Sequence, residues 1–351
     1  MKQIHKIAAM VTIVIAVVFT ITSCKKNNNT ENFNSDKSKL SLKIDTATKL
    51  YDTTKAGKQE GHYPTASRTA LKAAIDLANG VVTGSFTQQQ VNNALSNLGR
   101  AIDTYQTNRV QSVSPTNLVA FWKFTGNAVD SSGNGHNGTL KTNYVGSIAA
   151  AATDGGTLPI LTADRYGISN SAYTFNNGAY IEVPYDASLY PSSFTISVWV
   201  KTQTASNGNY IFSVDHYFGY KFQLQSNNFP FLTVSTDTGI HDIDDNPGAV
   251  TLNQWNHIIV TWTGGNATFY IDGKLTRTVN ATGNLIAPKT IVNLCIGNEL
   301  PKSAYNFTDT SNPNYFYGAS YFIGAIDDLR LYNKALTTTE IQSLFTMEST
   351  N

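Results

Sequence analysis

Residues 194–201 read FTISVWVK, and this stretch decides the fold of the larger part of the chain. Its apolar side chains at positions 194, 196, 198 and 200 alternate with Thr, Ser, Trp and Lys, which is the period of a strand with one buried face. Similar short strands recur from residue 117 onward, between turns rich in Gly, Asn and Asp and without interleaved helices. This pattern predicts a β-sandwich.

Two local signals refine this larger domain. Asp272-Gly273 lies between two strand-like runs and predicts a hairpin, since Gly accepts the positive φ of a tight turn. Thr337 and Glu340 have the spacing of a capping box, so we expect one late helix over residues 337–345.

Residues 38–108 carry helical periodicity instead. A first helix is expected over residues 40–51. A second is expected to start after the cap candidates Thr65 and Ser67 and to end at Gly80, and a third has Thr87 as its N-cap. Three short antiparallel helices follow from this pattern.

The first 23 residues have the positive start and apolar middle of a signal peptide. Ile21-Thr22-Ser23-Cys24 resembles a bacterial lipobox, which implies cleavage before Cys24 and acylation of its thiol. The alternative is a plain signal peptide with a chance cysteine. Residues 24–37 are polar and predict a tether from the membrane. The only other cysteine, Cys295, lies in an apolar run and is expected to be a small core residue.

Composition restricts the partners. Charged residues make up 14% of the chain and the net charge is +1, which argues against nucleic acid. The abundance of Asn, Thr, Ser, Gly and Tyr suits both extracellular β proteins and binders of polar ligands, and composition does not separate the two.

Four segments of the larger domain resemble the laminin-G/concanavalin A-like family. They are LVAFWKF (118–124) with DSSGNGHNG (130–138), FTISVWVK (194–201), WNHIIVTW (255–262) running into YIDG (270–273), and FIGAIDDLRLYNKAL (322–336). The resemblance implies an all-β jelly-roll sandwich over residues 117–347. This fold hosts lectins, adhesion modules and glycoside hydrolases, so it does not by itself give the function.

Residues 38–108 resemble the FIVAR-type three-helix modules of bacterial surface proteins, mainly through apolar spacing. The resemblance implies a spacer or a binding module, joined to the sandwich by a linker over residues 109–116. The whole chain is then a β-sandwich preceded by a small three-helix bundle.

The oxygen-rich loop from Asp130 to Gly138 suggests a structural Ca²⁺ site, although it matches neither a dinucleotide-binding motif nor an EF-hand. The family resemblance implies Asp130 and Asp327 as side-chain ligands, with Asn134 and His136 contributing backbone carbonyls. The alternative is that Asp130 caps a turn and that Asp327 accepts a hydrogen bond or pairs with Arg330.

Catalytic motifs are missing from the sequence. Glycoside hydrolysis needs two carboxylates across a substrate, and Glu182 stands alone on its strand. His257 follows Trp255 within a strand and is expected to be structural. We therefore expect no enzyme.

Two aromatic clusters provide candidates for ligand binding, because sugars pack on aromatic rings and hydrogen-bond to amides. About half of these side chains are alternatively core or loop-packing residues. The insertion over residues 144–167 and the loop over residues 305–317 both exceed the usual length of the family. The candidates are Tyr210, His216, Tyr217, Tyr220, Tyr305, Asn314, Tyr315 and Tyr317.

The sequence thus predicts a lipid-anchored lipoprotein of the outer membrane or cell surface that binds carbohydrate through a Ca²⁺-stabilised sandwich. The alternatives are a protein-binding adhesion module and a diverged glycoside hydrolase.

Overall fold

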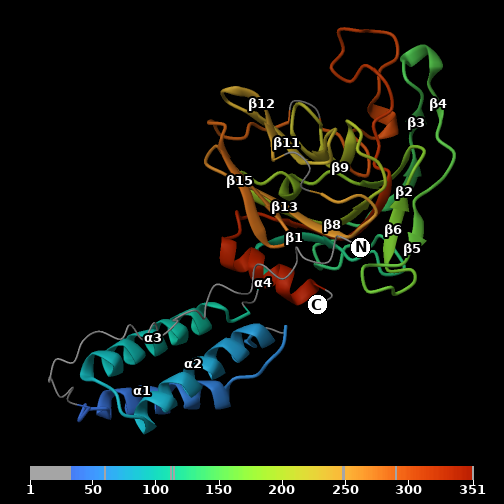
Figure 1. Ribbon diagram of the computed structural model, residues 1–351. Helices are drawn as coiled ribbons and strands as arrows, with labels where there is room; N and C mark the ends of the chain where they lie inside the picture. The colour runs from blue at the N-terminus through green and yellow to red at the C-terminus, as the bar shows by residue number, and fades with distance from the viewer. Residues whose placement is uncertain are drawn as a thin grey trace, which may run out of the picture.

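The computed structural model describes residues 33–58, 61–110, 113, 115–246, 250–288 and 291–349. Three helices are followed by a β-sandwich that carries a fourth helix at its end (Figure 1). The predicted signal peptide, Cys24 and most of the tether lie outside the described residues, so lipidation stays a prediction. Within the described part of the chain, no helix is both long and apolar enough to span a membrane.

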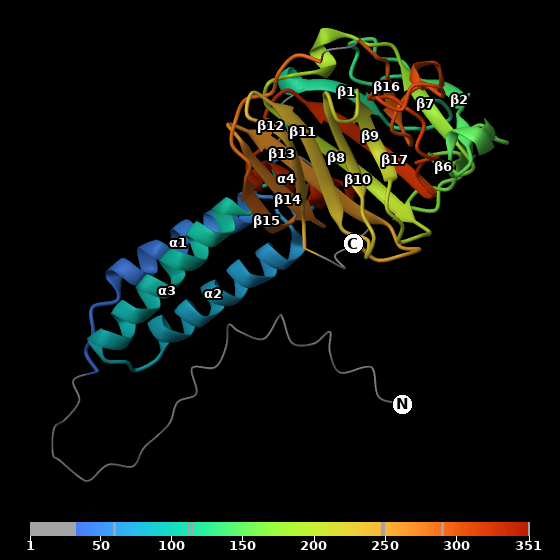
Figure 2. The ribbon, with the colours of Figure 1, turned by 90° about the horizontal axis from the view of Figure 1, so that it is seen from above.

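The N-terminal part is a bundle of α1 (Ser38–Thr53), α2 (Thr65–Thr83) and α3 (Gln88–Thr107), which extends away from the sandwich in Figure 2. One apolar face of each helix contributes to a shared core. The fully buried or nearly buried members of this core include Leu40, Ile44, Leu71, Ile75, Val91, Leu98 and Ile102.

The observed helix bounds confirm the predicted N-cap of the third helix and correct the predicted end of the second. The Thr87 side chain accepts a hydrogen bond from the Gln90 backbone N–H, and the Thr87 backbone N–H donates to the Gln90 side-chain oxygen, so the predicted N-cap is present. The predicted end of α2 at Gly80 is wrong. The helix continues past it because Val81 and Val82 pack against the bundle core, and this burial outweighs the helix-weakening effect of glycine.

Two antiparallel sheets form the sandwich. The eight-stranded sheet has the order β15-β14-β13-β8-β17-β6-β5, with β1 also paired to β17, and the seven-stranded sheet has the order β12-β11-β10-β9-β16-β7-β2. The strands of the first sheet are β1 (Leu118–Trp122), β5 (Ile160–Thr162), β6 (Ala172–Phe175), β8 (Phe194–Thr202), β13 (Asn256–Thr263), β14 (Asn266–Ile271), β15 (Lys274–Asn280) and β17 (Gly324–Tyr332). Those of the second are β2 (Thr139–Thr142), β7 (Ala179–Val183), β9 (Asn209–Val214), β10 (Tyr220–Leu224), β11 (Pro230–Thr236), β12 (Gly239–Asp244) and β16 (Leu294–Ile296). A separate hairpin joins β3 (Tyr144–Val145) to β4 (Thr153–Asp154).

The core lies between the two sheets and confirms the alternation of β8. Phe194, Ile196, Val198 and Val200 are fully buried in it, beside the indole rings of Trp122 and Trp262 among others. The residues between them face the opposite side of the sheet. Cys295 is also fully buried, as expected for a small residue in an apolar run.

The predicted hairpin and late helix are both present. Asp272 and Gly273 have φ values of 49° and 71°, and this turn joins β14 to β15. The late helix α4 (Thr338–Glu348) has Thr337 as its N-cap, and the Thr337 side chain accepts a hydrogen bond from the Glu340 backbone N–H. It packs on the outer face of the eight-stranded sheet through a small apolar cluster with Ile259, Tyr270, Tyr332, Leu336, Ile341 and Leu344.

Candidate functional site

A cleft of about 660 Å³ lies on the outer face of the seven-stranded sheet. Its walls come from β9 and β12, from the turn between β9 and β10, from Glu299 after β16, and from two loops that are distant in sequence. The lining residues are Gly146, Ser147, Tyr210, His216, Tyr217, Phe218, Ile240, Glu299, Pro313, Tyr315, Tyr317, Gly318, Ala319 and Ser320.

A β-bulge positions the aromatic floor of the cleft. The pairing of β9 with β10 slips by one residue at Ile211, so Ile211 and Phe212 both enter the core. The slip turns Tyr210 to the outer face of the sheet. Lys221 lies on the same face, and its ammonium donates a hydrogen bond to the Tyr210 hydroxyl at 3.1 Å.

Two opposite charges are built into this floor. The Lys221 ammonium lies 3.8 Å from the centre of the Tyr217 ring, which covers it from the cleft, and the whole residue is 2% exposed. Glu299 is partly exposed to the cleft, and its Oε1 accepts a hydrogen bond from the Tyr305 hydroxyl at 3.0 Å.

Burial is the largest influence on both charged groups. It lowers the pKa of Lys221 to about 8, although Glu299 and Asp242 act in the opposite direction. Burial also raises the pKa of the Glu299 carboxyl, against the hydrogen bonds from Tyr210 and Tyr305. The ammonium and the carboxylate therefore depend on each other in a region with little water.

His216 occupies a strained turn beside this floor. Asp215 and His216 have φ values of 55° and 27°, which residues with a side chain rarely adopt. The imidazole is tilted on the Tyr217 ring at 4.7 Å and is 5% exposed. Pro313 and Asn314 lie close enough to favour its protonated form, but neither ring nitrogen has a partner with hydrogen-bond geometry. Burial lowers the pKa of His216 to about 4, so its ring is neutral at pH 7.

The rim of the cleft is aromatic and accessible. Tyr317 is 71% exposed, and its hydroxyl donates to the Thr310 carbonyl at 3.0 Å, which ties the ring to the loop. The Tyr315 ring meets it edge to face at 4.9 Å. Tyr217 and Ile240 continue this exposed apolar surface.

Aromatic packing fixes the long loop that forms this rim. Phe316 is buried, and Tyr144 packs its ring edge-on against Phe307 at 4.8 Å. The Ala319 backbone N–H donates to the Gly146 carbonyl at 2.8 Å, which ties the loop to the insertion over residues 144–167. Figure 1 shows the orange-red loop and the green β3–β4 hairpin rising on the same side of the sandwich.

Of the eight predicted ligand-binding candidates, Tyr210, His216, Tyr217, Tyr315 and Tyr317 line this cleft. The prediction for Tyr220 is wrong, because its ring belongs to the core between the sheets and its hydroxyl donates to the Leu189 carbonyl. Tyr305 lies behind the floor and acts on the cleft through Glu299. Asn314 adjoins His216, and its buried side-chain oxygen has no hydrogen-bond partner.

Lys221 and Glu299 belong to the site but were not among the residues predicted from the sequence. A lysine within the apolar strand YKFQL, at the position that alternates away from the core, was a usable signal for Lys221. Glu299 follows β16 and gave no comparable signal, because its partners are far away in the sequence.

The predicted calcium ligands do not form one site. The two Asp130 oxygens accept four hydrogen bonds, from the backbone N–H groups of Phe121, Ser132 and His136 and from the Ser132 hydroxyl. Burial alone would raise the Asp130 pKa, yet these hydrogen bonds hold it below its usual value. Donor hydrogens therefore occupy the positions that a cation would need.

The other three predicted ligands have different partners. The His136 carbonyl, a predicted ligand atom, accepts from the Trp122 indole. The side chain of Asn134, whose backbone carbonyl was the predicted ligand, donates from Nδ2 to the Leu118 and Val119 carbonyls. Asp327 pairs with Arg165, and this also replaces the predicted pairing with Arg330. In the described ranges, no group of three or more His, Cys, Asp or Glu is arranged to hold a metal ion. The residues do not fit the predicted Ca²⁺ shell, and Ca²⁺ binding at any other place stays a prediction.

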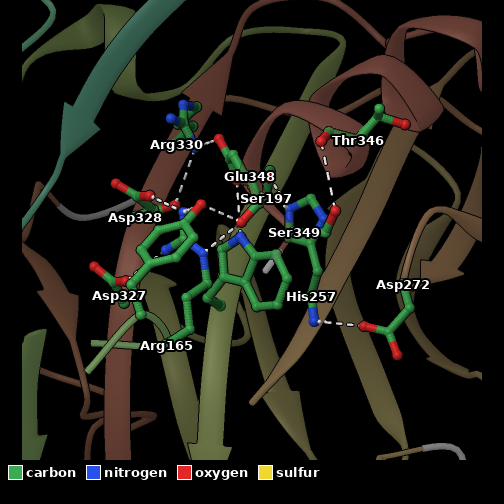
Figure 3. Close-up of polar contacts among 12 residues, drawn as sticks. Arg165, Ser197, His257, Asp272, Asp327, Asp328, Arg330, Thr346, Glu348 and Ser349 are labelled. Carbon is green, nitrogen blue, oxygen red and sulfur yellow. Dashed lines mark hydrogen bonds and ion pairs between the residues drawn. The ribbon is translucent and has the colours of Figure 1, made fainter. Parts of the chain in front are cut away.

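A second concentration of polar side chains, the α4 cluster, lies beneath α4 on the opposite sheet (Figure 3). It consists of Arg165, Ser197, Trp199, His257, Asp327, Asp328, Arg330 and Glu348. Arg165 reaches Asp327 at 2.6 Å and Asp328 at 2.7 Å, and its Nε donates to the Glu348 carbonyl at 2.8 Å. The Glu348 carboxylate accepts from the Trp199 indole at 2.8 Å and pairs with Arg330 at 2.5 Å.

His257 belongs to this cluster and has a structural role. It is fully buried, its Nε2 is 2.8 Å from the Ser197 hydroxyl, and its ring stacks on Trp199 at 4.9 Å. Burial lowers its pKa well below the usual value, so the ring is neutral. Burial of the Asp327 carboxyl, together with the nearby charge of Asp328, raises the pKa of Asp327 to about 8, although Arg165 acts in the opposite direction.

Residues 175–342 match the profile of the concanavalin A-like lectin/glucanases superfamily, in its laminin-G form. The β domain is a concanavalin A-like, laminin-G-type jelly roll. A search of curated proteins gave no match.

Solved structures provide further likenesses. Domain 4 of AbnA, a GH43 extracellular arabinanase from Geobacillus stearothermophilus solved with arabinotriose, is 20% identical, with 65% of this chain and 98% of that chain covered and a TM-score of 0.47. The binding domain of botulinum neurotoxin serotype G is 19% identical, with 67% and 52% covered and a TM-score of 0.46. The binding domain of Paraclostridial Mosquitocidal Protein 1 is 20% identical, with 66% and 52% covered and a TM-score of 0.45. The chain thus spans about half the length of the two toxin domains.

Proposed function

We propose that this chain is a non-catalytic cell-surface lipoprotein and that its cleft binds carbohydrate. The observation that carries the proposal is the combination, in one cleft, of exposed tyrosine rings with the polar side chains of Glu299, His216 and Tyr210. The lectin/glucanase fold of the domain supports the same ligand class.

The aromatic and the polar side chains of the cleft suit the two kinds of surface on a sugar, its C–H groups and its hydroxyl groups. The C–H surface of a pyranose packs on an aromatic face, which Tyr317 and Tyr217 offer at the rim. Hydroxyl groups need both donors and acceptors, and the cleft lining offers the Glu299 carboxyl group together with the hydroxyl of Tyr210.

The carboxylates support binding without catalysis. Among the described residues that line the cleft, Glu299 is the one acidic group, whereas glycoside hydrolysis normally uses two. Glu182 does not supply the second. Its carboxylate accepts from the Tyr180 hydroxyl and from the Asn293 amide, and it is not part of the lining.

The rest of the chain fits display at a surface. We propose that Cys24 carries the lipid anchor, and that the tether and the three-helix bundle hold the sandwich away from the membrane. In this arrangement the bundle acts as a spacer.

A glycan array probed with the mature full-length chain tests the proposal. We expect Tyr317→Ala to weaken the best glycan about tenfold, since an aromatic contact contributes about 0.5–1.5 kcal/mol beyond its buried area. Phe33→Ala is the matched control, because Phe33 is an aromatic residue that is 48% exposed and precedes the helical bundle. Binding to no glycan, or equal weakening by both variants, would contradict carbohydrate binding at this cleft. A protein ligand would then favour the adhesion alternative.

A further inference from the structure

The two charged side chains of the cleft floor differ in their access to a ligand, because Glu299 lines the cleft and Lys221 does not. Glu299 is the one Asp, Glu, Lys or Arg among the described lining residues. His216 is neutral at pH 7, because burial lowers its pKa to about 4. A ligand that enters the cleft therefore meets a carboxyl group and no cation.

The nearest cation is closed off from the ligand. Lys221 is 2% exposed and does not belong to the lining. The Tyr217 ring covers its ammonium at 3.8 Å, and the Tyr210 hydroxyl accepts one of its hydrogen bonds at 3.1 Å. Glu299 and Asp242 stabilise its charge. The lysine is thus neutralised within the protein.

From this arrangement we infer that the cleft selects neutral glycans and rejects uronic acids and other anionic sugars. The inference rests on the proposed carbohydrate function. A carboxylate or sulfate placed in the cleft would lose its hydration, approach Glu299 and find no accessible cation in return. Specificity then comes from the repulsion between Glu299 and an anionic sugar as well as from contacts with the preferred ligand.

Glu299 and Tyr217 have separable roles in this selection. Glu299 supplies the carboxyl group and balances Lys221. Tyr217 supplies the ring that keeps Lys221 from the ligand. Removing either one should make the buried ammonium available to an anionic sugar.

The experiment compares pairs of probes that differ mainly in charge. One pair is a cello-oligosaccharide and its C6-oxidised form, and the other is hexagalacturonate and its methyl ester. Affinities for the mature full-length chain are measured at pH 7. We expect at least one neutral member to bind, and its charged partner to bind at least about tenfold more weakly.

Two variants test the assigned roles. Glu299→Gln should reduce the neutral-to-anionic preference about tenfold or more, and Tyr217→Ala should strengthen anionic binding while it weakens neutral binding. Glu182→Gln is the matched control, because Glu182 is a partly buried glutamate on the same sheet and lies outside the lining. It should leave the preference unchanged.

The outcomes separate this inference from the proposed function. Equal or tighter binding of the anionic members overturns the selection and leaves carbohydrate binding standing. An unchanged preference in both folded variants overturns the roles of Glu299 and Tyr217. Binding of none of the four probes, with glycan binding found elsewhere on the array, overturns neutral selection for these backbones. Binding of nothing on the array contradicts the proposed function and the inference together.

Discussion

The cleft and the α4 cluster both bury charged side chains on the outer faces of the sandwich, yet they treat them differently. In the α4 cluster, Arg165 pairs with Asp327 and Asp328, Arg330 pairs with Glu348, and α4 covers these ion pairs. In the cleft, the Glu299 carboxyl group is partly exposed, and tyrosine rings stand exposed around it. A polar group that lines an accessible cavity beside exposed aromatic rings suits a ligand. Charges that are paired beneath a helix suit a structural role.

The insertion over residues 144–167 contributes to both regions. Near its start, Gly146 and Ser147 form part of the cleft wall. Near its end, Arg165 enters the α4 cluster and pairs with Asp327. One unusually long segment therefore shapes the proposed binding site and also fastens the C-terminal helix to the sheet.

Glu348→Ala should have the largest effect on stability. The change leaves the Arg330 charge and the Trp199 indole buried without their partner, and breaking a buried pair in this way costs about 3–5 kcal/mol. Urea unfolding followed by tryptophan fluorescence measures the loss. Asp154→Ala is the control, because its ion pair with Lys302 is largely exposed and should contribute under about 1 kcal/mol. Equal effects of the two variants would mean that the α4 cluster is not a structural network.

Asp130→Ala should have the next largest effect, because it leaves the N–H groups that now donate to Asp130 without an acceptor. We expect a loss of about 2–4 kcal/mol, since each buried donor without a partner costs about 1–3 kcal/mol and loop relaxation recovers part of this. The geometry predicts the same loss with Ca²⁺ and with EDTA. A melting temperature that falls on chelation in the wild type but not in Asp130→Ala would instead support the calcium role that the sequence suggested.

Local signals in the sequence were sufficient for much of the fold. The caps at Thr87 and Thr337 and the turn at Asp272-Gly273 depend on neighbouring residues, and all three are present. The alternation of β8 likewise fixed which of its side chains enter the core.

Features that depend on distant partners could not be predicted from these signals. The bulge at Ile211 turns Tyr210 outward, and no local motif marks it. Arg165 and Asp327 are 162 residues apart, so no local pattern could predict their ion pair. The sequence instead suggested a calcium role for Asp327 or a pairing with Arg330, which is close to it in the chain. Tyr220 was assigned to the binding cluster because it is near Tyr217 in sequence, but the alternation of β10 places it in the core.

Tyr317→Ala should have the smallest effect on stability, and it distinguishes binding from folding within one loop. Its ring is 71% exposed, so its loss should change the free energy of unfolding by under about 0.5 kcal/mol even though glycan affinity falls. The adjacent Phe316 is the matched contrast. Its ring is 1% exposed and packs against Phe307 and Tyr305, so Phe316→Ala should cost about 3–5 kcal/mol. A large stability loss in Tyr317→Ala would show that the rim is part of the loop's packing, and the cleft would then resemble the α4 cluster more than a preformed binding surface.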